Sequence, residues 1–133
     1  MKLRNLYLLN AVVCLVFALG LLLMTPVMLN LFGMDSTRDA TVLAQLLAVE
    51  LTVGGLITLL ARDVTDPQAR SAINYGNMIA GVLGFVVALN ATLTGVLGWF
   101  GYVIIAVYVI VALGFAYFQF FAPPDSVDEN LHL

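Results

Sequence analysis

Four long apolar segments, joined by short polar connections, make up most of the 133 residues. They cover about residues 6–24, 41–61, 72–93 and 100–121. A helix rises about 1.5 Å per residue, so each segment is close to the ~20 residues needed to cross the hydrocarbon core of a bilayer. The pattern therefore predicts an all-α integral membrane protein, in which residues 1–124 form one domain, a four-helix bundle.

Polar residues at the segment ends predict where the helices begin and end. Pro26 lacks a backbone N–H donor and predicts a bend near the end of the first segment. Asp35 or Ser36 is expected to cap the second helix, because short polar side chains accept hydrogen bonds from the free N–H groups of the first turn. Asp66 followed by Pro67 predicts a cap with proline at the first position of the third helix.

Basic residues fall unevenly on the two sides of a four-span topology. Arg38 lies between the first and second spans, and the other four lie on the opposite side: Lys2, Arg4, Arg62 and Arg70. Because short cytoplasmic loops are enriched in Lys and Arg, we expect both termini in the cytoplasm and the chain in a cell inner membrane. Pro123 and Pro124 are expected to end the fourth span, and residues 125–133 to form a short acidic cytoplasmic tail.

Composition agrees with a membrane location and excludes several functions. Apolar residues make up 62% of the chain and charged residues 10%, against about 25% charged in soluble domains. The five basic residues form no cluster, so nucleic acid is not an expected partner. With Cys14 and His132 as the only residues of their kinds, the sequence predicts no disulfide, metal site or cofactor. It also lacks a nucleophile paired with a base, so we do not expect an enzyme.

A row of small residues marks one face of the third span. Its members are four positions apart and so lie near one another on the helix surface: Ala72, Gly76, Ala80, Gly84 and Ala88. In lipid, helices associate largely where small residues let their backbones approach closely. The row therefore predicts a packing face, used inside the bundle or against a partner.

Glu50 lies near the middle of the second span. A charged carboxylate at that depth costs about 2.5 kcal/mol or more, so the side chain should face the protein interior, find a partner or be protonated. Tyr108 lies at matching depth on the fourth span and could donate a hydrogen bond to it. Three hypotheses remain open: a proton or cation site, a neutral carboxyl that joins two helices, and a contact to a partner subunit.

A layer of polar side chains lies closer to the expected cytoplasmic surface. Asn10, Thr58 and Asn77 belong to it, and Asn10 and Asn77 could bridge the first and third spans. Amides at this depth usually join helices by hydrogen bonds, and the alternative is that they line a polar cavity or hold a ligand.

The chain resembles small bacterial four-helix membrane proteins to which no activity is assigned. The resemblance rests on short motifs: Thr25-Pro26 followed by Leu31-Phe32-Gly33-Met34, Leu46-Leu47-Ala48, Gly54-Gly55-Leu56 and Gly98-Trp99. The small multidrug resistance transporters also combine four spans with one membrane-embedded glutamate. That family carries its glutamate in the first span, whereas Glu50 lies in the second, so no residue role is transferred from it.

Two functions are compatible with these features. The first is a non-enzymatic accessory or scaffolding subunit, which packs through the small-residue row against its own bundle or against other membrane subunits in the lipid bilayer. The alternative is a small proton-coupled transporter or ligand-binding membrane protein, alone or as a homodimer, that uses Glu50 with Tyr108 as its partner.

Overall fold

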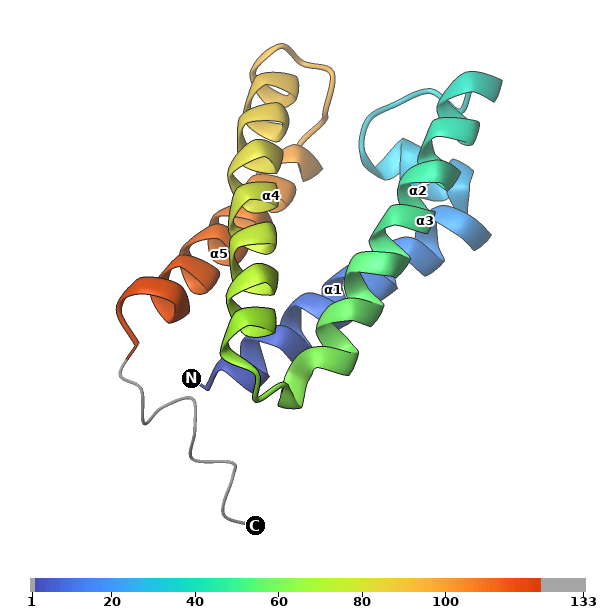
Figure 1. Cartoon of the computed structure of the whole chain (residues 1–133). Coiled ribbons are helices and arrows are strands. Elements are labelled where there is room, and N and C mark those ends of the chain that lie inside the picture. The colour runs from blue at the N-terminus through green and yellow to red at the C-terminus, as the bar shows by residue number, and fades with distance from the viewer. Residues whose placement is uncertain (1, 123–133) are drawn as a thin grey trace.

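The computed structural model describes residues 2–122, and within this range every regular element is a helix. The elements are α1 (Leu3–Leu23), α2 (Thr25–Leu31), α3 (Arg38–Leu60), the 3₁₀ turn η1 (Ala61–Asp63), α4 (Pro67–Leu93) and α5 (Phe100–Phe120), shown in Figure 1. Four of these helices are long and apolar enough to cross a membrane: α1, α3 with η1, α4 and α5. The prediction of an all-helical chain with four such segments is therefore confirmed. Pro123, Pro124 and the acidic tail lie outside the described residues.

The helix caps agree with the sequence at one position and differ at another. Asp66 Oδ2 accepts a hydrogen bond from the Ala69 N–H at 2.8 Å, which confirms the predicted cap of α4. The predicted cap of α3 by Asp35 or Ser36 is wrong. The backbone is still extended at Thr37, with φ −73° and ψ 162°. The Thr37 hydroxyl oxygen accepts a hydrogen bond from the Ala40 N–H at 3.2 Å. The cap is therefore the last extended residue, and a helix cannot be capped by residues that precede it by two or three positions.

The expected bend at Pro26 is a break between two helices. α1 ends at Leu23, and Met24 leaves the helical region at φ −129° and ψ 40°. Pro26 then lies in the first turn of α2, where its missing N–H would have no intrahelical acceptor in any case. α2 folds back so that Leu29 packs with Leu21 of α1 against Ala44 and Ala48 of α3.

The four long helices form two hairpins, α1 with α3 and α4 with α5, which diverge from the short connection between α3 and α4 (Figure 1). Glycines set the closest approach within each hairpin. A Cβ at Gly55 of α3 would lie 2.8 Å from the Leu15 side chain of α1, and one at Gly81 of α4 would lie 2.9 Å from the backbone nitrogen of Ala112 in α5. This is how helices pack in lipid, where dispersion contacts between close backbones replace the hydrophobic effect.

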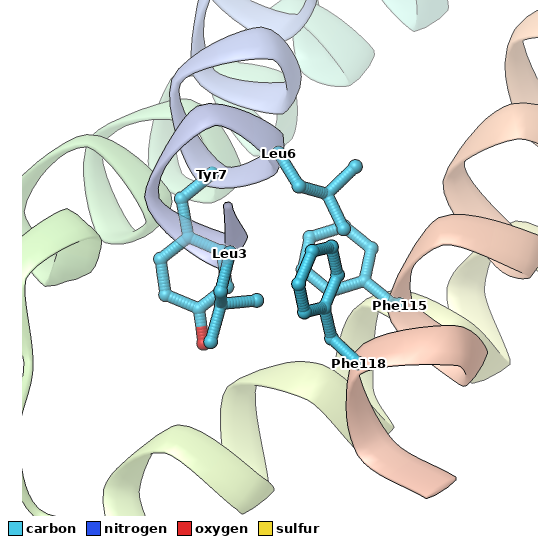
Figure 2. Packing of buried hydrophobic residues seen from close by; sticks show 5 residues of the cluster. All are labelled: Leu3, Leu6, Tyr7, Phe115 and Phe118. Carbon is cyan, nitrogen blue, oxygen red and sulfur yellow. The ribbon is translucent and has the colours of Figure 1, made fainter. Parts of the chain in front are cut away.

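The two hairpins contact each other at both ends. Near the N-terminus, Leu3, Leu6 and Tyr7 of α1 pack against Phe115 and Phe118 of α5, as Figure 2 shows. All five side chains are at least nine-tenths buried.

At the opposite end, the rings of Phe17, Phe32 and Phe100 form a cluster with centroids 5.5–6.4 Å apart. The Gly98 N–H beside it donates to the Phe32 carbonyl oxygen at 2.9 Å. This contact, at the end away from the N-terminus that is termed the outer end, connects the loop of one hairpin to the loop of the other.

The start of α1 and the connection between α3 and α4 lie at the same end of the molecule (Figure 1). Arg4 Nε lies 3.1 Å from Asp63 Oδ1, and Arg62 Nε lies 3.4 Å from the second oxygen of the same carboxylate. Arg38 begins α3 at the other end. Between the ends, large apolar side chains are exposed along all four long helices, as expected of surfaces that contact lipid.

Candidate functional site

A cavity of about 440 Å³ lies between the two hairpins, within the 300–1,000 Å³ typical of small-molecule sites. All four long helices line it, and the loop residues Phe32, Met34 and Leu97 line its outer end. Most of its wall is aliphatic or aromatic. The cavity exists because the hairpins touch at both ends and diverge between them.

Three of the polar residues singled out in the sequence meet at the inner end of the cavity. Asn10 Nδ2 of α1 donates to Asn77 Oδ1 of α4 at 3.2 Å and to Thr58 Oγ1 of α3 at 3.4 Å. The Asn77 amide nitrogen donates to the Ile73 carbonyl oxygen at 2.9 Å, and the Thr58 hydroxyl donates to the Gly54 carbonyl oxygen at 3.0 Å. Each side chain of this amide floor, defined as Asn10, Thr58 and Asn77, therefore donates to at least one acceptor within the protein.

A second network closes the same end. The Tyr7 hydroxyl donates to Asn74 Oδ1 at 2.9 Å, Asn74 Nδ2 donates to Gln119 Oε1 at 3.3 Å, and Gln119 Nε2 donates to Ser71 Oγ at 3.0 Å. The chain of bonds joins α1, α4 and α5. Gln119 and Ser71 were missed in the sequence because each lies close to a helix end, where polar residues are expected to face the headgroups. The two residues lie at matching depth on their helices, and this was the signal that could have indicated their contact.

Glu50 lines the cavity from α3, between Leu47 and Leu51. Of the described residues that line it, Glu50 alone carries a charged group. Within residues 2–122 its carboxyl forms no hydrogen bond and no ion pair. Glu50 is exposed as well as part of the cavity wall.

Tyr108 lines the cavity from α5, on the other hairpin. Its ring packs against Gly84, where any Cβ would overlap it. Gly84 lies seven residues outward from Asn77, and Glu50 lies eight residues outward from Thr58, so both side chains lie roughly 10–12 Å above the amide floor. No hydrogen bond joins Glu50 and Tyr108 in the described part of the chain. The hydrogen bond considered from the sequence is not formed, and both side chains line the cavity between the hairpins instead.

The small-residue row of the third span divides into two parts. Gly84 and Ala88 face α5, and Ala88 is 4% exposed. The closest backbone approach is at Gly81, which is not in the row. A helix turns once in 3.6 residues, so a row with a fixed spacing of four drifts off the contact, whereas positions 81, 84 and 88 stay on one face. The alternating spacing of three and four was readable in the sequence.

The remaining members of the row do not pack in this chain. Ala72, Gly76 and Ala80 are exposed, and a Cβ at Gly76 would meet nothing within 4 Å. Ala80 lines the cavity. The face of α4 that carries Ala72 and Gly76 is thus exposed.

The described residues contain no group of three or more His, Cys, Asp and Glu side chains placed to hold a metal ion. Cys14 lines the cavity as a free thiol about one helical turn inward from Phe17. Comparison of the chain with protein-family models, with curated proteins and with solved structures finds no match in any of the three. The resemblance to small bacterial four-helix membrane proteins therefore stays a prediction.

Proposed function

We propose that this chain is a non-enzymatic membrane protein that binds a small, largely apolar molecule between its two hairpins and exchanges a proton with it at Glu50. The observation that carries the proposal is an apolar cavity of about 440 Å³ with one unpaired carboxyl on its wall. Carrier and transporter activity both require such a site. Scaffolding does not, because a subunit that only packs gains nothing from an internal space.

The position of the carboxyl supports exchange. An ionised carboxyl in the middle of a bilayer is unfavourable by about 2.5 kcal/mol or more, and a cation beside it reduces that cost. A ligand that brings a positive charge can displace the proton. Glu50 is therefore suited to couple ligand occupancy to protonation, and no other described cavity residue carries a charge.

We further propose that the end carrying Arg4, Arg62 and Arg70 faces the cytoplasm, in the inner membrane of a bacterial cell. The amide floor then lies on the cytoplasmic side of the cavity and the aromatic cluster on the outer side. Both termini are cytoplasmic in this arrangement.

A second candidate function is that of an accessory subunit in a larger membrane complex or a homodimer. It is favoured by Ala72 and Gly76, because a small-residue surface left open on a lipid-facing helix can accept a helix of another chain. The two functions are compatible, and different residues of the same protein carry them.

Two glycines provide matched variants that separate these functions. A Cβ meets nothing within 4 Å at either Gly54 or Gly76, but Gly54 lines the cavity and Gly76 does not. Native mass spectrometry of the protein, released gently from its own membrane, reports bound small molecules and partner chains together.

The ligand-binding proposal predicts a small molecule bound to the wild type and to Gly76→Leu that is lost in Gly54→Leu. Loss of a partner chain in Gly76→Leu alone would support the accessory function. A wild-type chain that carries no small molecule, or one retained in full by Gly54→Leu, would count against binding in this cavity.

A further inference from the structure

The cavity is a narrow slot whose long axis runs across the membrane. Its α1 wall extends from Asn10 to Leu21, which is roughly 16 Å at about 1.5 Å per residue. A volume of about 440 Å³ spread over this length makes the space longer than it is wide. Such a slot has room for a hydrocarbon chain.

One side of the slot is open to lipid. On the opposite side, α1 and α5 are bridged by Leu6 against Phe115 at the inner end and by Phe17 against Phe100 at the outer end. α3 and α4 diverge from their connection (Figure 1). Glu50 and Ala80 line the cavity from these two helices and are both exposed. A ligand dissolved in the bilayer can therefore enter sideways between α3 and α4.

Two groups that recognise a cation lie at one level of the slot. Glu50 and Tyr108 line the cavity from α3 and α5 at the depth derived above. Phe17 lines it from α1 further outward, in the cluster with Phe32 and Phe100. A carboxylate combined with aromatic rings is the usual environment for an ammonium group in a protein, because both the charge and the ring faces attract it.

The slot is less suited to other ligand classes. An anion would be repelled by Glu50, and no basic residue lines the wall. A neutral acceptor such as a quinone needs hydrogen-bond donors, and each side chain of the amide floor already donates within the protein. The Tyr108 hydroxyl donates to no acceptor within the described residues, but a single phenol beside a carboxyl favours a cation over a neutral acceptor.

Building on the ligand-binding function, the geometry points to a lipophilic organic cation with a single slender chain as the ligand. Its ammonium nitrogen lies between Glu50 and Tyr108, and its chain lies along the slot. It enters from the bilayer between α3 and α4, and its charge takes the place of the proton on Glu50.

The test is equilibrium binding to the full chain in nanodiscs of zwitterionic lipid, with empty nanodiscs subtracted. Radiolabelled dodecyltrimethylammonium, below its micelle-forming concentration, is compared with radiolabelled dodecanol, which has the same chain and no charge. We expect saturable binding of the ammonium and an affinity for dodecanol that is lower by about tenfold or more, equal to about 1.4 kcal/mol.

Glu50→Gln, which keeps the shape of the side chain, should weaken ammonium binding by a similar factor and leave dodecanol unchanged. Equal affinities for the two probes, or a Glu50→Gln variant that binds the ammonium as well as the wild type, would overturn the cation inference. Saturable binding of both probes that Gly54→Leu abolishes would leave the ligand-binding function standing and remove only the ligand class. Absence of saturable binding of either probe would contradict both. The comparison of the two probes on the wild type does not depend on how the variant folds.

Discussion

Gly81 and Gly76 lie on the same helix and predict opposite results for the same substitution. At Gly81 the added methyl of alanine would lie 2.9 Å from the Ala112 backbone nitrogen and 3.0 Å from its Cβ. Neither atom is the end of a flexible side chain, so α4 and α5 must move apart. At Gly76 the methyl meets nothing within 4 Å. The comparison isolates helix packing, because both residues lie inside α4.

The magnitudes follow from two known effects. Overpacking a close contact costs about 1–3 kcal/mol, and alanine is up to about 1 kcal/mol more favourable than glycine within a helix. Gly81→Ala should therefore lower the free energy of unfolding by a net ~1–2 kcal/mol. Gly76→Ala should leave it unchanged or raise it by up to ~1 kcal/mol.

The assay is reversible unfolding in mixed micelles of dodecyl maltoside with increasing dodecyl sulfate, followed by near-ultraviolet circular dichroism. The reasoning requires the two variants to differ by about 1 kcal/mol or more, with Gly81→Ala the less stable. Equal stabilities would show that α4 and α5 do not approach each other at Gly81, and the register used to place Tyr108 would then be wrong.

Three further predictions concern the outer loops, the amide floor and the start of α3. Gly33 and Gly95 both have positive φ, of 78° and 76°, but only a Cβ at Gly33 would meet the opposite hairpin, at 2.9 Å; Gly33→Ala should therefore be less stable than Gly95→Ala by about 1 kcal/mol or more in the same unfolding assay. Asn10→Leu removes two interhelical hydrogen bonds of about 0.6 kcal/mol each and should lower the unfolding free energy by about 1 kcal/mol; no change would show that the floor does not join the helices. Thr37→Ala should cost about 1 kcal/mol through its lost cap, whereas Ser36→Ala should cost less than half of that; the reverse order would restore the cap expected from the sequence.

The spans could be predicted because their length and polarity follow directly from the thickness of a bilayer. The cap at Asp66 was readable for a similar reason, since proline after it permits only the first turn of a helix. The cap of α3 was not, because the run from Asp35 to Thr37 offers three capping side chains and the extended length of the loop decides among them.

The pairing of the helices could not be derived from the apolar pattern. In lipid every face of a span is apolar, so the pattern does not indicate which face meets a neighbour. The depth of Glu50 and Tyr108 could be counted along the helices. The space between these two residues could not be predicted, because it arises from the divergence of two hairpins that contact each other only at their ends.

The central claim is that an open space reaches Glu50 between the hairpins, and Cys14 tests it directly as the one cysteine of the chain and a residue of the cavity wall. The rate of its reaction with membrane-permeant N-ethylmaleimide is measured in nanodiscs for the wild type, Gly54→Leu and Gly76→Leu. The account predicts measurable labelling of the wild type and of Gly76→Leu, and labelling slowed several-fold in Gly54→Leu, where the new side chain fills the space. A thiol that is equally reactive in all three proteins, or unreactive in all three, would contradict the cavity.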